Sequence, residues 1–423
     1  MMIDYFEEIK KRNLFVSDHS NEINEKRIFL RIDTNSAVVN GNLDLNSYKL
    51  FAHAQTLKKY VDAGAIPIII THQGRRGDDE FIPNLGPIAR KMEGISGIKI
   101  NYIDQVIGEK VGEAINKLKL GEALLIKNIR DYPHETEFET THPCHSDCTH
   151  CDRLNKMANS PLSQFFQNEV NAFVNDGLSV CHRCQLSVVA LTKMIPFYFG
   201  LLLESELQTI QEMIDDLKNG KDVTFFIGGK KFEKLNYLEK ILEYPGARFL
   251  TGGLIGQYFA YADGLEFNEE NKKLMKPSEI ENAARLLDKF RDKIFYPLDF
   301  KTDDDSDVAR GRLRSSNRVI MDIGPETLNY YAKNVNGRSV FAGVMGVFEK
   351  GFDNTLKLLR MAAAPDAVNL GGHSSAALFQ DHGIYHYFTQ RGGKVITAGG
   401  AALALLAGEK MPGLETCFCK EEK

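Results

Sequence analysis

The sequence predicts an α/β protein of two domains, each built on a parallel sheet with helices on both faces. The chain has 423 residues, which is more than one hydrophobic core usually encloses. Short apolar runs of strand character alternate with segments of helical periodicity along its whole length. These runs are apolar on both faces, as expected of parallel strands that helices cover on either side.

The expected strands fall into two sets, one in each half of the chain. The first set occupies residues 27–33, 66–72, 98–104, 122–130 and 172–176. The second set occupies residues 222–229, 247–253, 318–324, 339–344, 366–372 and 394–400. The polar stretch 301–317 reads as a loop, because its charged and small residues show no apolar periodicity.

Composition and charge restrict the class of protein. An apolar share of 43% and a charged share of 26% are typical of a soluble globular protein. The net charge of −5 disfavours nucleic acid or an anionic membrane as the main partner. The N-terminus lacks the apolar segment of a secretory signal, and the longest apolar run, 194–203, is about half of a membrane span. We therefore expect a cytoplasmic protein without a nucleic-acid or membrane partner.

The two halves end their strands with different residue types. The first-half strands run into Asp33, His72, Arg130 and the pair Asn175–Asp176, whereas the second-half strands run into glycines. Ligands of open parallel sheets bind beyond the carboxyl ends of the strands. Cationic ends suit a small anion, and glycine ends let backbone N–H groups approach a polyphosphate. The first half therefore predicts an anion site and the second a nucleotide site, without a P-loop motif.

Ten segments in order resemble the phosphoglycerate kinase family, most closely its archaeal form, over nearly the whole chain. In the first half they are "RIDTNS", "THQGRRGD", "KNIRDY" and "FVNDGLSVCHRCQLSVV". In the second half they are "FIGGKKFEK", "TGGLIGQYF", "MDIGPETLNYYA", "GVMGVFEKG", "LGGHSSAAL" and "TAGGAAL". Each segment alone is weakly specific, but their order and spacing together are highly specific.

The resemblance implies two Rossmann-like, three-layer domains joined by a hinge helix. Residues 1–189 would bind 3-phosphoglycerate and 209–399 the nucleotide, with the joining helix near 190–208 and 400–423 returning to the first domain. The implied reaction is reversible transfer of a phosphoryl group from 1,3-bisphosphoglycerate to Mg-ADP, giving 3-phosphoglycerate and ATP. Such a transfer needs positioning and charge neutralisation rather than covalent chemistry. Closure of the two domains would exclude water.

The resemblance also implies roles for individual residues in this sequence. Asp33 and Asn35 would hold the hydroxyl and carboxylate end of the glycerate, and Lys49 and Lys231 would act on the phosphoryl group in transfer. Glu349 would accept hydrogen bonds from the ribose. The basic patch around the non-transferring phosphate would consist of His72, Arg75, Arg130 and Arg183. The nucleotide would be lined by Gly228, Gly229, Gly252, Gly253 and Gly343, with the helix start at Gly371, Gly372, His373 and Ser374 facing its phosphates.

Two departures from the family pattern bear on the rate of transfer. Lys49 stands where the family has an arginine, so the charge is kept but the bidentate fork is lost. By analogy with one oxyanion donor, that loss is worth about 2.7–4 kcal/mol, or about 10²–10³ in rate. In the segment before "MGVFE", Ala342 replaces an asparagine and Val344 a proline.

Two further departures lie at the nucleotide side. Leu370 and Ala401 each replace a glycine of the family's triple-glycine turns. Each adds a Cβ, which narrows the space for a phosphate at the turn. His373 stands where many members carry an aspartate that orients Mg²⁺, as archaeal members often do.

Cysteines cluster at residues 142–151 and again after residue 180. Cys148-x₂-Cys151 followed by Cys181-x₂-Cys184 is a spacing typical of tetrahedral Zn²⁺ with four thiolates, and the ordinary family pattern lacks it. We therefore expect a structural zinc site, with Cys144 or His145 as an alternative ligand and a four-thiolate iron–sulfur cluster as an alternative metal. The C-x₃-C-x₂-C spacing from Cys144 also matches a radical-SAM motif, but a polar loop precedes it instead of a barrel strand. No role is assigned to Cys417 and Cys419.

Three functions compete on the sequence alone. The first is an active phosphoglycerate kinase, monomeric or homodimeric. The second is a weakened or non-catalytic descendant that binds nucleotide or phosphoglycerate, which Lys49 and Ala342 favour. The third is a kinase for a related acyl phosphate, which the basic patch permits. The retained substrate and nucleotide residues favour the first.

Overall fold

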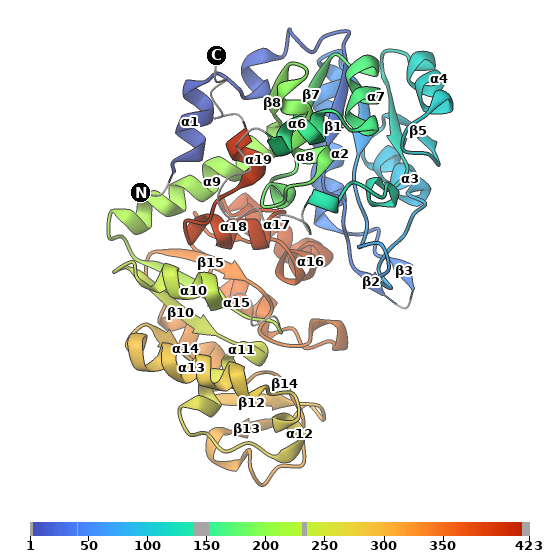
Figure 1. Cartoon of the computed structure of the whole chain (residues 1–423). Helices are drawn as coiled ribbons and strands as arrows, with labels where there is room; N and C mark the ends of the chain where they lie inside the picture. The colour runs from blue at the N-terminus through green and yellow to red at the C-terminus, as the bar shows by residue number, and fades with distance from the viewer. Residues whose placement is uncertain (1–2, 40, 139–151, 231–234, 417–423) are drawn as a thin grey trace. The chain divides into compact units, whose positions relative to one another are not determined.

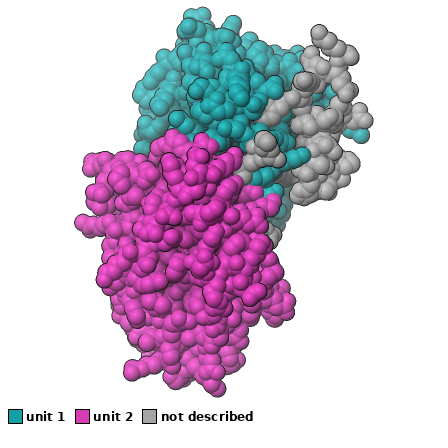
Figure 2. Space-filling view, turned by 90° about the vertical axis from the view of Figure 1, so that its left-hand side faces the viewer, with its two compact units in different colours: residues 1–211, 408–423 teal, residues 212–407 magenta. Residues whose placement is uncertain are grey.

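The fold is described from a computed structural model that covers residues 3–39, 41–138, 152–230 and 235–416. The chain forms two compact units, coloured separately in Figure 2. Residues 1–211 and 408–423 make up the first unit, and residues 212–407 make up the second.

The first unit contains a six-stranded parallel sheet in the order β5-β6-β4-β1-β7-β8 (Figure 1). The expected α/β class with parallel sheets is confirmed, and each of the five strands expected in this half is present. The edge strand β8, Phe197–Phe199, lies in the apolar run that was not expected to form a strand. The other strands are β1 Arg27–Arg31, β4 Ile66–Ile70, β5 Lys99–Ile103, β6 Glu122–Ile126 and β7 Ala172–Asn175.

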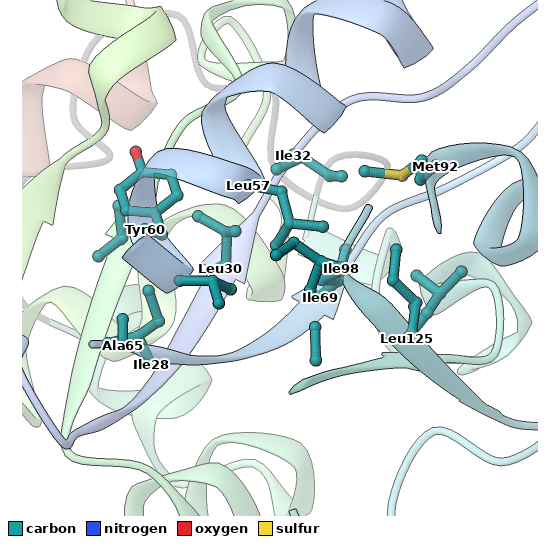
Figure 3. Packing of buried hydrophobic residues seen from close by; sticks show 14 of the residues in the cluster. Ile28, Leu30, Ile32, Leu57, Tyr60, Ala65, Ile69, Met92, Ile98 and Leu125 are labelled. Carbon is teal, nitrogen blue, oxygen red and sulfur yellow. The ribbon is translucent and has the colours of Figure 1, made fainter. Parts of the chain in front are cut away.

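Alternate residues of the strands point to opposite faces of this sheet, and each face has its own core. On one face, Ile28 and Leu30 of β1 pack with Ile69 of β4 and Leu57 of helix α2, Tyr48–Asp62 (Figure 3). Helix α3, Gly86–Ser96, adds Met92 to the same cluster. The strands are therefore buried on this side by two amphipathic helices.

The opposite face of the first sheet is filled by aromatic side chains. Phe29 of β1 makes edge-to-face contacts with Phe173 of β7, at 5.3 Å between ring centroids, and with Phe166, at 4.8 Å. Phe166 belongs to helix α7, Pro161–Glu169, which Ser160 caps. Burial on both faces explains why this sheet reads as continuous apolar runs.

The second unit contains another six-stranded parallel sheet, in the order β11-β10-β9-β15-β16-β17. Phe226 of β9 and Phe341 of β15 stack at 4.5 Å on one of its faces, within a cluster that also includes Leu359 of helix α15, Asn354–Ala362. The strands are β9 Val223–Ile227, β10 Ala247–Thr251, β11 Ile294–Phe295, β15 Arg338–Ala342, β16 Val368–Asn369 and β17 Lys394–Val395.

Two expectations for the second half are wrong. The strand expected at 318–324 is β14, Ile320–Ile323, but it lies in a separate antiparallel sheet of order β13-β12-β14. The polar stretch 301–317, which was expected to be a loop, contains β13, Asp307–Ala309, and the end of β12, Asp299–Thr302. Phe300 of β12 packs against Phe267, whereas Asp299 and Thr302 are polar residues that are nevertheless buried, so β12 shows no apolar pattern in the sequence.

The elements near the joining segment also differ from the expected ones. The stretch 190–208 is not one helix: the short helix α8, Leu186–Val189, a 3₁₀ turn and β8 precede helix α9, which runs from Leu201 to Lys218. The border between the units falls inside α9. Helix α18, Gly399–Leu406, belongs to the second unit, so the returning segment begins at Gly408. Among the residues that the structure describes, no helix combines the length and apolar character of a membrane span.

Candidate active site

Polar side chains gather at the carboxyl ends of four neighbouring strands in the first unit. Asp33 follows β1, His72 follows β4, Arg130 follows β6, and Asp176 follows β7. These strands are adjacent in the order β6-β4-β1-β7, so their ends share one edge of the sheet. All four side chains are buried although each carries a titratable or charged group. Buried charges of this kind persist only where partners satisfy them.

Asp33 is the centre of this cluster. Its Oδ2 accepts hydrogen bonds from Lys49 Nζ and Ser179 Oγ, and its Oδ1 accepts from the backbone N–H of Asn35 at 3.0 Å. Burial alone would raise the pKa of Asp33, but the charge of Lys49 and the hydrogen bonds from Lys49 and Ser179 hold the pKa well below its usual value. The Asp33 carboxylate is therefore ionised.

Lys49 lies at the start of helix α2, which places its ammonium over the end of β1. Ser47 caps this helix by accepting from the Leu50 N–H, and Ser36 donates to the Ser47 hydroxyl at 2.7 Å. The side chain of Lys49 is 21% exposed and its ammonium bonds Asp33. An ammonium has three donors, so two remain available for a ligand or water.

His72 is held as a neutral ring. Arg31 Nη2 lies 3.3 Å from His72 Nδ1, and because a guanidinium can only donate, Nδ1 must accept and the ring proton sits on Nε2. Burial lowers the pKa of His72 well below its usual value. The positive charges of Arg130, Arg31 and Lys49 lower this pKa further, whereas the negative charge of Asp33 raises it. His72 thus offers an N–H donor, not a positive charge.

Arg31 is a charged residue inside an apolar strand and is fully buried. Its Nε donates to Ser187 Oγ at 2.9 Å, and one Nη donates to the carbonyl of Ile32. Ser187 Oγ in turn donates to Glu135 Oε1 at 2.6 Å, and the Ser187 N–H donates to Oε2 at 3.0 Å. Burial raises the pKa of Glu135 to about 7, against the opposing charge of Arg31. A relay of Glu135 and Ser187 therefore orients Arg31, and Arg31 orients His72.

The loop after β4 is tied to the loop after β6. Arg130 Nη1 donates to the Gly74 carbonyl at 2.6 Å, and Asn35 Oδ1 accepts from the Gly74 N–H at 2.9 Å. Asn128 Nδ2 donates to the carbonyls of Gln73 and Ile82 at 2.7 and 2.8 Å. The structure thus brings Asn35 and Arg130 to the same loop that follows His72.

Two of the expected cations stand at the rim of this cluster. Arg75 is exposed on the loop after His72, and Arg183 is half-buried on the turn after β7. Arg183 is positioned by its backbone N–H, which donates to the Val180 carbonyl at 3.0 Å.

Cys181 and Cys184 flank Arg183 but face inward. Both are buried, and they form no disulfide with each other. Cys181 Sγ lies 3.6 Å from the Gly177 carbonyl and 3.5 Å from Asn175 Nδ2, and burial raises the pKa of the Cys181 thiol to about 12. Within the described ranges, no group of three or more His, Cys, Asp or Glu is placed to hold a metal ion. Cys144, His145, Cys148, Cys151, Cys417 and Cys419 lie outside the described residues.

The expected nucleotide site of the second unit is built from glycines that pack against backbone. A Cβ on Gly228 would lie 2.1 Å from the Val344 carbonyl oxygen, and one on Gly343 would lie 2.3 Å from the Gly228 oxygen. A Cβ on Gly252 would lie 2.4 Å from Met345 Sδ. The loops after β9, β10 and β15 therefore meet at van der Waals distance, which only glycine permits.

The same loops are joined by hydrogen bonds. The Gly253 N–H donates to the Met345 carbonyl at 2.6 Å. Among the described residues, nothing lies within 4 Å of a Cβ added at Gly229, whose φ is 95°, so there is room for a ligand beside this glycine. These glycines thus bring the ends of β9, β10 and β15 together, and space remains beside Gly229 at the end of β9.

Helix α16, His373–Gln380, begins directly after the loop that follows β16. Gly372 at its N-cap has φ 101° and no neighbour within 4 Å of an added Cβ, so the first N–H groups of the helix are approachable. Ser374 points back to the sheet: its Oγ donates to Leu370 O at 2.8 Å and accepts from the Gly343 N–H at 3.3 Å. Gly371 packs on Thr397 O.

The remaining expected nucleotide residues are only partly described. Glu349 lies on an exposed 3₁₀ turn, Phe348–Lys350. Lys231 lies outside the described residues, as does the side chain of His373.

The sequence matches the model of the phosphoglycerate kinase family over residues 17–409. The chain belongs to the phosphoglycerate kinase family. A relative from Methanosarcina acetivorans, phosphoglycerate kinase 1, is 30% identical over 413 residues, covering 93% of each chain. The phosphoglycerate kinase of Pyrococcus furiosus is 29% identical and covers 95% of this chain and 97% of its own.

Solved structures show the same relationship. The crystal structure of phosphoglycerate kinase from Pyrococcus horikoshii superposes with a TM-score of 0.79 at 26% identity, covering 96% of this chain and 98% of the other. The structure from Coxiella burnetii, at 24% identity and a TM-score of 0.66, supports the fold. Membership makes this chain a phosphotransferase of the phosphoglycerate kinase type, EC 2.7.2.3, with ATP or ADP and Mg²⁺ as the family's nucleotide and metal.

The sequence reasoning missed the residues behind the site. Arg31, Ser187, Glu135 and Ser179 were not named, although they hold His72 and Asp33. One of them had a sequence signal, because Arg31 interrupts the otherwise apolar run "RIFLRID". The other three are ordinary polar residues of loops and gave none.

Proposed function

We propose that the first unit binds 3-phosphoglycerate and 1,3-bisphosphoglycerate at the edge of the sheet that carries Asp33. The observation that supports this most is the ionised, buried Asp33, which bonds Lys49 and lies beside His72, with Arg31 and Arg130 close by. Asp33 would accept the substrate hydroxyl, and the His72 Nε2–H would donate to a phosphate oxygen. Arg130, with the rim cations Arg75 and Arg183, would neutralise the non-transferring phosphate.

The second unit would bind ADP or ATP at the ends of β9, β10 and β16. Open space beside Gly229 and Gly372 supports this placement, because backbone N–H groups there can reach phosphate oxygens. Gly228, Gly252, Gly253, Gly343 and Gly371 would keep the surrounding loops in contact, and Glu349 would receive the ribose. Lys231 and His373 are assigned to the phosphates on the family resemblance alone.

The proposed mechanism uses positioning and charge rather than a covalent intermediate. Lys49, already fixed by Asp33, would neutralise the phosphoryl group between donor and acceptor. The described residues contain no carboxylate cluster that would bind Mg²⁺ by itself. Mg²⁺ would therefore be held mainly by the nucleotide phosphates, where it neutralises charge.

Separate binding measurements test the assignment of the two units. We expect Arg130→Ala to weaken binding of 3-phosphoglycerate at least tenfold, because the variant removes a buried cation, while ADP affinity stays within about twofold. Isothermal titration with each ligand measures both quantities. Gly94→Ala, on an α3 surface with open space, is the matched control. Unchanged 3-phosphoglycerate affinity in Arg130→Ala would remove the first unit's edge as the anion site.

A structural zinc at Cys148, Cys151, Cys181 and Cys184 is proposed on spacing alone. The Cys181 thiol weighs against it, because this thiol faces inward to the Gly177 carbonyl and the turn would have to rotate to direct it at a metal. Metal analysis of protein purified without added metal decides the point, and about one zinc per chain is the outcome that supports the site. An iron content instead would support the cluster alternative.

A cytoplasmic location, the lack of nucleic-acid and membrane partners, and a monomeric or homodimeric state are likewise proposals. Net charge supports the second of these. Light scattering of the purified protein measures the third.

A further inference from the structure

A buried histidine on helix α2, His53, takes part in none of the roles above. It is 1% exposed. Its Nε2 accepts a hydrogen bond from the backbone N–H of Asp33 at 3.2 Å, and its Nδ1 lies 3.7 Å from Oδ2 of Asp176. One ring therefore stands between the residues that follow β1 and β7, two neighbouring strands.

The contact with Asp33 fixes the protonation of this ring. A backbone N–H can only donate, so Nε2 presents its lone pair and the ring proton lies on Nδ1. In the described part of the chain Nδ1 makes no hydrogen bond of normal length. The Asp176 carboxylate is thus the acceptor that the geometry offers for the Nδ1 proton.

Asp176 connects the ring to the helix that crosses the border between the units. Its Oδ1 accepts from the N–H groups of Leu202 and Leu203, at 2.7 and 3.3 Å, in the first turn of α9. Its Oδ2 accepts from the Thr56 hydroxyl at 2.9 Å. An added Cβ on Gly200 would lie 2.3 Å from Asp176 Oδ1, so no side chain fits between Asp176 and the helix start.

We propose that His53 is a positioning residue that fixes the Asp33 backbone through Nε2 and links it to the first turn of α9 through Nδ1 and Asp176. The proposal rests on the function proposed for Asp33. A change in the Asp33 backbone on substrate binding would move the His53 ring and so alter its contact with Asp176. Asp176 bonds the first turn of α9, and this helix continues from Gln211 of the first unit into Glu212 of the second. His53 would then contribute to the energetic coupling between the two ligand sites, which must be reciprocal.

Two amide variants separate the two sides of the ring. His53→Gln places a carbonyl oxygen where Nε2 accepts, and loses the donor at Nδ1. His53→Asn places an N–H donor near Nδ1, and loses the acceptor for Asp33. Thr56→Val is the matched control, because it removes a second donor to Asp176 without touching Asp33.

Calorimetric titrations of the full chain with 3-phosphoglycerate, with and without saturating ADP, provide the readouts. No turnover occurs with this pair. We expect His53→Asn to weaken 3-phosphoglycerate binding about three- to tenfold, the worth of one buried hydrogen bond. We expect His53→Gln and Thr56→Val to keep the 3-phosphoglycerate affinity within about twofold of the native value. In both variants, saturating ADP should change this affinity less than it does in the native protein.

Two results would overturn the proposal, and a third would overturn only the function on which it rests. Wild-type affinity and wild-type ADP dependence in both amide variants would show that His53 positions nothing. A ¹⁵N NMR spectrum of the native protein with the His53 proton on Nε2 would contradict the tautomer, and this readout needs no variant to fold. If instead the native protein fails to bind 3-phosphoglycerate, the function proposed for Asp33 fails, and the NMR result still judges the His53 geometry.

Discussion

The resemblance to the family places Lys49 where an arginine is expected, and the structure shows the contacts that this lysine makes. Its ammonium bonds Asp33 and helps to keep that carboxylate ionised. A lysine is a point charge, so it neutralises Asp33 and a phosphoryl group without the planar geometry of an arginine fork. At the residue scale, the proposed phosphoryl transfer would therefore rely on a lysine that Asp33 already holds.

Ser187 is predicted to matter more for stability than an ordinary serine. Ser187→Ala would remove the hydroxyl that bonds both Glu135 Oε1 and Arg31 Nε, and only the backbone N–H at this position would still bond the Glu135 carboxyl. We expect a cost of about 1–3 kcal/mol in the free energy of unfolding. Urea unfolding measures this. Ser163→Ala, which removes a buried hydroxyl that bonds only neutral groups, should cost less. Equal losses for the two variants would contradict the relay.

Glu135 predicts a pH dependence of stability with a definite sign. Its pKa is about 7 in the folded chain against an ordinary 4.5, so between these values the folded state holds a proton that the unfolded state has lost. Stability from this group is therefore present at low pH and lost as pH rises to about 7. In Glu135→Gln the side chain does not titrate, and it still offers hydrogen-bond partners to Ser187.

Urea unfolding of both proteins from pH 4.5 to 8 measures this effect. Wild type should lose stability relative to Glu135→Gln as pH rises through the window, and then level off. Contributions of His72 and Asp33 are common to both proteins and largely cancel. A constant difference across the window would show that the Glu135 pKa is ordinary.

At the scale of elements, the ends of parallel strands bring the candidate site residues together. The expected strands of the first half form one sheet, because a strand buried on both faces is apolar at every position and easy to recognise. The strand 318–324 is as apolar as the others, and nothing local shows that it pairs antiparallel with β12. Pairing partners depend on tertiary contacts, so sequence reasoning placed Gly324 at the wrong sheet.

The candidate site, too, was predicted from the sequence only in part. Asp33, His72 and Arg130 were predicted as neighbours because their strands are parallel and end at one edge. The glycine turns were predicted to line a ligand, yet most of them pack on the backbone of another loop. A glycine pattern indicates close approach, but the approaching group can be protein as well as ligand.

Gly228→Ala is predicted to separate the loops after β9 and β15. The added Cβ would lie 2.1 Å from the Val344 oxygen, which belongs to backbone and cannot rotate away. We expect a loss of about 1–3 kcal/mol in stability and weaker ADP binding, measured by thermal unfolding and calorimetry. Gly400→Ala, in helix α18 with open space around it, should be neutral or stabilising. Unchanged ADP affinity in Gly228→Ala would argue against a nucleotide at these loops.

At the scale of the whole molecule, the first unit is completed by both ends of the chain. Tyr5 donates to Glu415 Oε1 at 2.6 Å, and the Gly413 N–H donates to the Cys181 carbonyl at 2.7 Å. The segment around Gly413 thus supports the turn that carries Arg183. The second unit is continuous in sequence, with its own sheet and core.

Removal of residues 408–423 is predicted to destabilise the first unit selectively. The truncated chain loses the partners of Tyr5 and of the Cys181 turn, while the cores of the second unit keep all their residues. Calorimetric unfolding should show two transitions. The transition of the first unit should move to a lower temperature than in the full chain, and that of the second unit should stay at the same temperature. A uniform shift of the whole transition would mean that the two units unfold as one.

The most direct test of the account is ATP-dependent phosphorylation of 3-phosphoglycerate by the native protein, measured in a coupled assay beside Lys49→Arg and Lys49→Ala. We predict measurable activity in the native protein, a fall of about 10²–10³ in kcat for Lys49→Ala, and activity at or above native for Lys49→Arg. Activity in Lys49→Arg alone would mean a scaffold weakened at one position. No activity in any of the three, with ADP and 3-phosphoglycerate still binding, would contradict the account and favour a non-catalytic member of the family.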